Sequence, residues 1–258
     1  MDTHRKYGVA PYTVVVVHGG PGALGELTTV ASRIGEYEGC LETLHAACTV
    51  EGQVEELREA IEKHTHAPVS LIGHSWGAWL VFIFAARYTS LVRKVILIGS
   101  GPFEASYASE IMKTRMSRLT DSERDEVQSL IFRLTDKLNV DDSTLARFGR
   151  LLAKADIYDP LEINEKVTVR SDVYEGVWPE ASALRESGEL LRMGSSIECP
   201  VVAIHGDYDP HPAEGVRRPL SQVIKEFEFI LLKNCGHKPW IERAAQARFY
   251  DILRDHLT

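Results

Sequence analysis

Five residues, Gly73-His74-Ser75-Trp76-Gly77, place a serine hydroxyl between two glycines. They follow an apolar run and precede a strongly apolar helix-like stretch, so the pattern predicts a tight turn from a strand into a helix. Such a turn strains the backbone of its serine and projects Oγ above the sheet edge, where it can act as a nucleophile. A side chain at either glycine would clash with the neighbouring strand and helix. Ser75 is therefore the candidate nucleophile.

A nucleophilic serine needs a base within hydrogen-bond reach. His237 is the strongest candidate, because it lies in a Gly-His loop directly after the apolar run Phe227–Leu232, which predicts a strand. His74 adjoins the serine, but neighbours on a sharp turn point apart. The remaining histidines that could compete lie upstream of the turn: His45, His64 and His66. The last two end an amphipathic helix, and we interpret them as solvated rather than as metal ligands.

The base needs an acid to orient it, and two carboxylates follow the buried strand predicted at residues 201–204. Asp207 is close to the strand end and could hydrogen-bond the turn itself, a common role for aspartate. Asp209 lies further out and precedes Pro210, which forces an extended backbone at the aspartate. The residues therefore favour Asp209 as the acid, with Asp207 as the alternative.

Two backbone N–H groups are candidates for stabilising a developing oxyanion. Trp76 follows the serine at the start of a helix, where N–H groups lack intrahelical partners. The second donor is expected from the glycine-rich loop His18–Gly22, which follows the apolar strand predicted at residues 13–17. Gly20 is the preferred donor in that loop, and Gly19 is the second choice.

These motifs, in this order along the chain, resemble the α/β-hydrolase superfamily. The His-Gly-Gly-Pro-Gly loop and the tryptophan after the serine are similar to the proline iminopeptidase-like group. The resemblance implies that Asp209, three residues after Gly206, is the acid. It also implies a serine hydrolase with a Ser75, Asp209 and His237 triad, with no cofactor and no metal.

Strand-like and helix-like runs alternate along most of the chain, which predicts a mostly parallel sheet of about six strands flanked by helices. The alternation stops after residue 101 and resumes near residue 196. We therefore expect an α/β core of residues 1–101 and 196–258 and a strand-free helical cap of residues 102–195 over the site. In that cap Glu175 and Glu180 flank Trp178, where they could bind a substrate amine.

The chain has 258 residues, 44% of them apolar and 26% charged, with a formal net charge of -8. These values predict a soluble globular protein and argue against nucleic-acid partners. The polar N-terminus and the short apolar runs predict no signal peptide and no membrane span. Four scattered cysteines predict small buried residues in a reducing, cytoplasmic compartment. The expected partner is a small molecule or a short peptide, and the sequence does not determine the oligomeric state.

The sequence alone also allows functions other than ester hydrolysis. The substrate of a hydrolase could be a small ester, or an amide as in an aminopeptidase. Gly20-x-Gly22-x-x-Gly25, with Glu42 further on, has the form of a dinucleotide-binding fingerprint and would make an NAD-binding oxidoreductase. Pro21 counts against it, because it removes a backbone donor from the turn. A non-catalytic binding protein of the same fold would be expected to lack one member of the triad.

Overall fold

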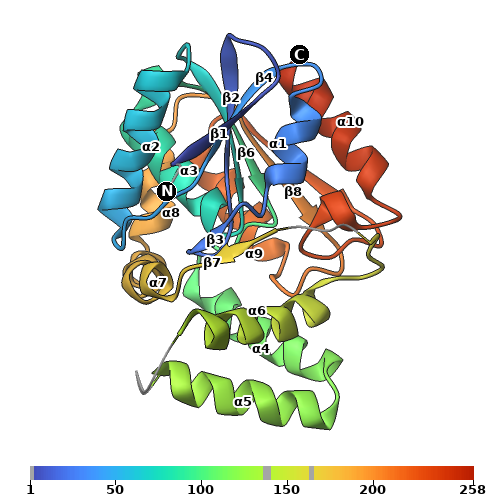
Figure 1. Cartoon of the computed structure of the whole chain (residues 1–258). Coiled ribbons are helices and arrows are strands. Elements are labelled where there is room, and N and C mark those ends of the chain that lie inside the picture. Colours follow the sequence, from blue (N-terminus) through green and yellow to red (C-terminus); the bar gives the residue numbers. More distant parts are fainter. Residues whose placement is uncertain (1–2, 136–140, 163–165) are drawn as a thin grey trace.

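The computed structural model describes residues 3–135, 141–162 and 166–258. Its centre is a seven-stranded sheet in the order β1-β4-β2-β5-β6-β8-β9 (Figure 1). All neighbours in the sheet pair in parallel except β1 with β4. The strands are β1 (His4–Tyr7), β2 (Tyr12–Val17), β4 (Gly39–Thr43), β5 (Val69–His74), β6 (Val92–Ile98), β8 (Val201–Gly206) and β9 (Phe227–Leu232).

Both faces of the sheet are covered by helices, which is why its central strands are apolar on both sides. Along β2, Val15 and Val17 pack on one face, while Val14 and Val16 pack on the other. The second face is covered by α1 (Thr28–Ile34) and α10 (Gln246–Leu257). The first face is covered by α2 (Val50–His64), α3 (Trp76–Arg87), α8 (Glu189–Met193) and α9 (Glu214–Val223).

The prediction of a mostly parallel, helix-flanked sheet is confirmed, but the strand count of about six was one too low. The additional strand is β1, whose sequence His4-Arg5-Lys6-Tyr7 is polar and carries no apolar signal. It lies at the edge of the sheet, where charged side chains are normal because they discourage pairing with other chains. The strands predicted at residues 13–17, 201–204 and 227–232 lie within two residues of the observed bounds of β2, β8 and β9.

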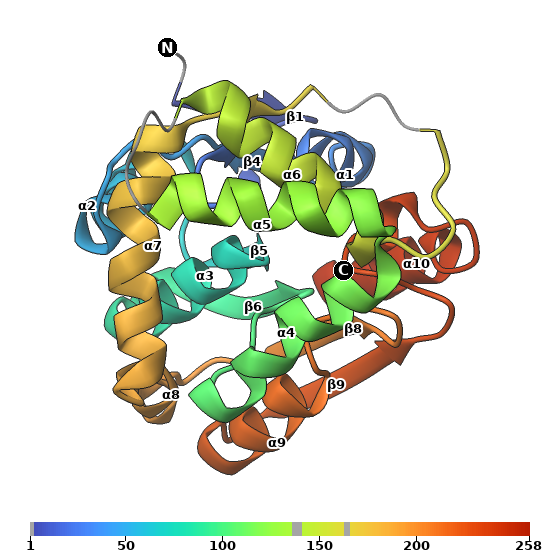
Figure 2. The same ribbon diagram turned by 90° about the horizontal axis from the view of Figure 1, so that it is seen from below.

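In the described part of the segment between β6 and β8 there are four long helices and the short helix α8, where the sequence predicted a helical segment. Three of them, α4 to α6, share a small apolar cluster around Phe148 and Leu151. Figures 1 and 2 show α4 to α7 gathered at one end of the core. The long helices are α4 (Ala105–Arg118), α5 (Asp121–Thr135), α6 (Asp142–Asp156) and α7 (Ser171–Glu186).

The expectation that this segment contains no strand was wrong. A two-residue strand, β7 (Thr168–Val169), pairs antiparallel with β3 (Ala23–Leu24). A pair this short leaves too few residues for an alternating pattern, so periodicity cannot reveal it. The pair joins the segment to the glycine-rich loop after β2.

Short 3₁₀ turns complete the fold: η1 (Thr89–Leu91), η2 (Gly194–Ser196) and η3 (Pro239–Ile241). Among the described residues, no helix combines the length and apolarity that crossing a bilayer needs. All four cysteines are free thiols. Cys40 and Cys235 are buried as predicted, Cys199 is partly buried, and Cys48 is exposed.

Candidate active site

Ser75 lies on the turn between β5 and α3 in a backbone conformation that L-residues rarely adopt. Its φ is 53° and its ψ is -113°, and its N–H donates to the Ile98 carbonyl of β6 at 3.0 Å. A Cβ at Gly73 would collide with the Gly77 carbonyl, and one at Gly77 would collide with the Val17 carbonyl. Both glycines are therefore required for the turn to pass this close to its neighbours. Strain of this kind costs about 1–3 kcal/mol and is typical of functional sites.

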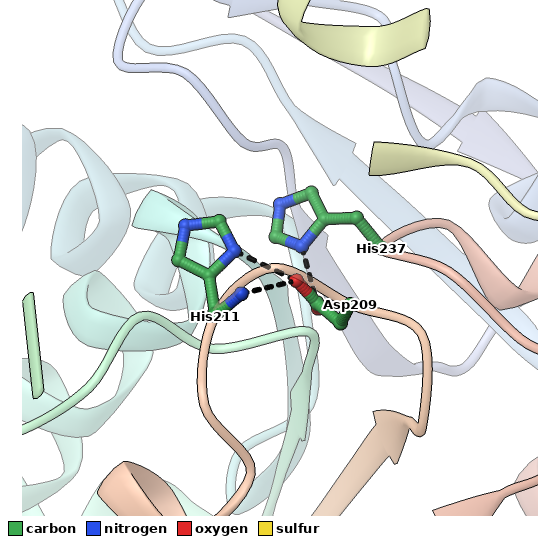
Figure 3. Close-up of side chains that lie close together, drawn as sticks. All are labelled: Asp209, His211 and His237. Atoms are coloured by element: carbon green, nitrogen blue, oxygen red, sulfur yellow. Dashed lines mark hydrogen bonds and ion pairs between the residues drawn. The ribbon is translucent and has the colours of Figure 1, made fainter. Parts of the chain in front are cut away.

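Asp209 and His237 meet at the carboxyl ends of β8 and β9, as Figure 3 shows. His237 Nδ1 lies 2.7 Å from Asp209 Oδ2, and both residues are buried. The His237 N–H also donates to the Asp156 carbonyl at 2.8 Å, which fixes its loop. At Gly99, just after β6, a Cβ would stand 2.7 Å from the His237 carbonyl oxygen. The end of β6 thus adjoins both Ser75 and His237.

Asp207, the alternative acid, points elsewhere. Its Oδ1 accepts the Cys235 N–H at 3.3 Å, and its Oδ2 lies 3.6 Å from the Lys233 ammonium. These contacts join the loop after β8 to the loop after β9 without reaching the imidazole of His237. Of the two carboxylates, Asp209 is the one that contacts that ring.

A second histidine, which was not predicted from the sequence, lies beside Asp209. His211 donates its backbone N–H to Asp209 Oδ1 at 2.9 Å, and its Nδ1 lies 2.8 Å from the same oxygen (Figure 3). The His211 ring stacks on the His237 ring with centroids 4.5 Å apart. Its carbonyl oxygen lies 2.8 Å from Nε2 of His205. Aspartate often bonds the backbone two residues on, and this was the only available signal for His211.

Burial and charge shift the pKa values of Asp209, His211 and His237 in different directions. Burial would raise the pKa of Asp209, but the surrounding imidazoles of His237, His211 and His205 hold it well below its usual value. Burial lowers the pKa of His211 to about 4, despite the attraction of Asp209. Burial opposes the protonation of His237 too, yet the Asp209 charge raises its pKa above the usual value. Of the two imidazoles that direct Nδ1 to Asp209, His237 therefore has the raised affinity for a proton.

Asp209, His211 and His237 also form the one group in the described part of the chain whose ligand atoms could hold a metal ion, all within 4.8 Å of one another. Each imidazole, however, already directs Nδ1 to an oxygen of Asp209. A cation at that place would compete with the Nδ1 protons for the same carboxylate. The hydrogen bonds alone account for the geometry. His64 and His66 belong to no such group among the described residues.

A buried carboxylate, Glu26, links the glycine-rich loop to the serine turn and to the His237 loop. Glu26 Oε2 accepts the Gly19 N–H at 3.0 Å and lies 2.9 Å from His74 Nδ1. His74 Nε2 lies 3.1 Å from the His237 carbonyl oxygen, and Lys238 Nζ lies 2.9 Å from Glu26 Oε1. His74 thus acts as a connector, in agreement with its rejection as the base.

The hydrogen bonds of Glu26 also bear on the choice between Gly19 and Gly20 as the oxyanion donor. Because Gly19 N–H is taken by Glu26, Gly20 is the better candidate in that loop. Gly20 has a φ of 109°, and it is the exposed residue of the two. Trp76 opens α3, and its indole is anchored to Gln53 Oε1 at 2.8 Å.

Removing the charge of Glu26 should destabilise the fold strongly. The variant Glu26→Gln is expected to lose about 3 kcal/mol of unfolding free energy at neutral pH, the lower end for breaking a buried ion pair. Burial would raise the pKa of Glu26, but Lys238 and His74 hold it well below the usual value. Its contribution is therefore present above the unfolded pKa and lost as pH falls through the folded pKa.

Urea unfolding of the wild type and of Glu26→Gln, at neutral and at acidic pH, measures the difference in their free energies of unfolding. The gap in stability should close as the solution is acidified. The exposed Glu36, which pairs with Arg33 on the surface, gives a matched control, and Glu36→Gln should have little effect. Equal losses in the two variants would contradict a structural role for the Glu26 network.

Ser75, the candidate nucleophile, borders a pocket of about 190 Å³, whose lining does not include Asp209 or His237. Ser75, Trp76 and His211 line it from the core. Residues of α4 and α7 also line the pocket, including Trp178. The expected amine-binding glutamates are elsewhere: Glu175 is exposed, and Glu180 Oε2 accepts the Val50 N–H at 2.7 Å and so caps α2.

A family model described as "alpha/beta hydrolase fold" matches residues 35–244. The chain belongs to the α/β-hydrolase family. Its placement in the family agrees with the sheet order, the serine turn after β5 and the loops after β8 and β9. No protein of curated function is significantly similar to the sequence.

Solved structures of the family share the fold at low sequence identity. VinJ superposes with a TM-score of 0.73 at 16% identity, covering 98% of this chain and 93% of that chain. The monoacylglycerol lipase of Paleococcus ferrophilus has a TM-score of 0.63 at 16% identity, covering 98% and 97%. E-2-(Acetamidomethylene)succinate hydrolase has a TM-score of 0.63 at 13% identity, covering 98% and 93%. These identities support a common fold and do not transfer a substrate.

Proposed function

We propose that this protein is a serine hydrolase that cleaves a small ester or amide through an acyl-enzyme intermediate. The observation that carries the proposal is the 2.7 Å contact between Asp209 and His237. His237 adjoins the same end of β6 as Ser75, which is strained and lines a pocket. The three residues come from separate loops at one edge of the sheet. The packing of these loops does not require a strained serine. The strain at Ser75 therefore favours a chemical role for this residue.

In the proposed mechanism Ser75 Oγ attacks the carbonyl carbon of the substrate while His237 Nε2 takes its proton. His237 Nδ1–H stays donated to Asp209, whose charge stabilises the imidazolium. The N–H groups of Gly20 and Trp76 stabilise the oxyanion. His237 then gives its proton to the leaving group, and a water molecule activated by the same imidazole hydrolyses the acyl-enzyme.

Two of the alternatives lose support from particular contacts. An aminopeptidase needs a carboxylate for the substrate amine, but among the described residues no acidic side chain lines the pocket. A dinucleotide site needs Glu42 at a strand end. Glu42 instead lies inside β4, fully buried, and accepts hydrogen bonds from Tyr7 and Thr28.

The function is tested with a fluorophosphonate probe and with two substrate panels, p-nitrophenyl esters and amino-acid naphthylamides. We expect covalent labelling of the protein and hydrolysis of short acyl esters, with a burst of p-nitrophenol as the acyl-enzyme forms. Hydrolysis of naphthylamides alone would favour the aminopeptidase. An unlabelled, inactive protein would contradict the proposal as a whole.

The proposed mechanism predicts that activity falls as the pH is lowered. His237 must be unprotonated to act as the base, and its pKa is raised above the usual value by Asp209. Activity is therefore lost as pH falls through this raised pKa, while His211, with a pKa of about 4, stays neutral in that range. A profile of kcat/KM against pH should show one acidic limb of unit slope. A limb centred near pH 4 would contradict His237 as the base.

A further inference from the structure

The pocket beside Ser75 is apolar over most of its lining and yet contains two cationic side chains. Its apolar walls include Trp79 of α3, Ile111 and Met112 of α4 and Trp178 of α7. The charged residues that line it are Arg115 and Arg185. An apolar pocket with a few placed polar groups is the usual form of a small-molecule site, and the polar groups set the orientation of the ligand. The two arginines differ in what they bind within the protein.

Arg115 is compensated by a protein carboxylate. Its Nε lies 2.7 Å from Asp156 Oδ1 and its Nη2 lies 2.6 Å from Asp156 Oδ2, and both side chains are largely buried. A two-pronged contact of this kind is the strongest pairing available to a guanidinium. Burial would lower the pKa of Arg115, but Asp156 raises it above the usual value. Arg115 therefore has its counter-ion and is needed to hold α4 against α6.

Arg185 has no such counter-ion in the described part of the chain. Its Nε is buried and has no hydrogen-bond partner there. Its guanidinium lies over the ring of Trp79, 5.5 Å from the centroid. Trp79 is held by its indole N–H, which donates to the Gly101 carbonyl at 3.1 Å, and it stacks on Trp178 at 6.2 Å. The aromatic face supports the cation but offers no acceptor for its N–H groups.

Removing a guanidinium from water without a hydrogen-bond partner is unfavourable in free energy. A ligand that supplies the missing acceptor offsets this penalty. Burial lowers the pKa of Arg185, partly offset by Glu186, but a guanidinium stays protonated in proteins. Its planar set of donors matches the two oxygens of a carboxylate. We infer that the substrate carries a carboxylate, which Arg185 binds in the pocket next to Ser75.

This inference rests on the proposed function and names the class of its substrate: a carboxylate-bearing ester or amide. The apolar walls between Ser75 and Arg185 fit a hydrocarbon or aromatic spacer between the scissile bond and the carboxylate. A substrate amine is disfavoured at the same place, because both charged groups of the lining are positive. The carboxylate can lie on the acyl part or on the leaving group, and the experiment distinguishes the two.

The test uses pairs of substrates that differ only in charge. One pair is the p-nitrophenyl monoester of adipic acid and its primary amide, which place the group on the acyl part. The other pair is para-acetoxybenzoate and para-acetoxybenzamide, which place it on the leaving group. In the wild type, kcat/KM for the acid should exceed that for the amide by about 10- to 100-fold in one pair, the range for hydrogen bonds to a charged group.

The variant Arg185→Met keeps the apolar stem over Trp79 and removes the charge. Its acid-to-amide ratio should fall to about one, and Arg185→Lys should give an intermediate ratio, because an ammonium lacks the planar fork. Arg192→Gln is the matched control, since Arg192 is an exposed arginine of α8 paired with Glu189. It removes one positive charge from the same region and should keep the wild-type ratio.

The outcomes separate this inference from the proposed function. Fluorophosphonate labelling of the wild type with no acid preference in either pair, or an unchanged ratio in Arg185→Met, would overturn the inference and leave the serine mechanism in place. Calorimetry of adipate binding to Ser75→Ala provides a readout without turnover. Adipate should bind at least 10-fold more tightly than its uncharged diamide, and Arg185→Met in that background should abolish the difference. Equal binding of the two would also overturn the inference.

Discussion

Replacing Ser75 by alanine should lower kcat for ester hydrolysis by about 10⁶-fold, the loss seen when the nucleophile of a serine hydrolase is removed. The hydroxyl is the only group of the site that can form the covalent bond in the proposed mechanism. The remaining machinery, including the N–H groups of Gly20 and Trp76, would still polarise a bound carbonyl. A small residual rate above the uncatalysed reaction is therefore expected rather than none.

Two measurements check the prediction for Ser75. Stopped-flow assays should show no burst of p-nitrophenol in Ser75→Ala, and a fluorophosphonate probe should leave the variant unlabelled. Ser109→Ala is the control, because Ser109 is an exposed serine of α4 outside the pocket lining. It should be labelled like the wild type. Full labelling of Ser75→Ala would place the nucleophile on another residue.

Replacing Asp209 by asparagine should lower kcat by about 10⁴-fold, as in a well-studied serine protease triad. The direction of the new amide follows from the contacts of the carboxylate. Oδ1 accepts the backbone N–H of His211, a donor that cannot be removed, so the amide oxygen of the asparagine should take that position. The amide NH₂ then faces His237 Nδ1 and forces the proton onto Nε2. His237 would then present a proton to Ser75 instead of accepting one.

Asp207→Asn is the matched control on the same loop. Because Asp207 contacts the Cys235 N–H and Lys233 but not the His237 ring, its loss should act on loop stability and change kcat by less than about tenfold. Measuring kcat and thermal unfolding for both variants separates the two roles. If Asp207→Asn were the inactive variant and Asp209→Asn nearly normal, the assignment of the acid would be reversed.

Much of the fold could be predicted because its signals are local. Parallel strands buried on both faces are continuous apolar runs, and the intervening helices show their own spacing, so the alternation is visible without a structure. The strands that were missed are β1, a polar edge strand, and the two-residue strands β3 and β7. These strands are held in place by backbone hydrogen bonds. Backbone hydrogen bonds do not require a particular pattern of side chains, so the sequence does not reveal them.

The chemical candidates were also visible locally. Ser75, Asp209 and His237 each follow a predicted strand, and the carboxyl ends of parallel strands meet at one edge of a sheet. The sequence by itself therefore determined the family of the fold and which loops meet. It also made Ser75 a strained residue, because only the two flanking glycines allow α3 and β5 to come so close.

Only the tertiary structure decided how the candidates are supported. Glu26 and His74 are 48 positions apart, and His74 and the His237 carbonyl are 163 apart, yet they form one network. The tertiary structure also gives the two arginines of the pocket different partners. Asp156 of α6 pairs with Arg115, whereas Arg185 lies over the ring of Trp79. The physical reason is that helical periodicity shows which residues share a face, but not which distant side chain meets that face. Charge compensation and pocket chemistry depend on that distant partner, and packing alone selects it.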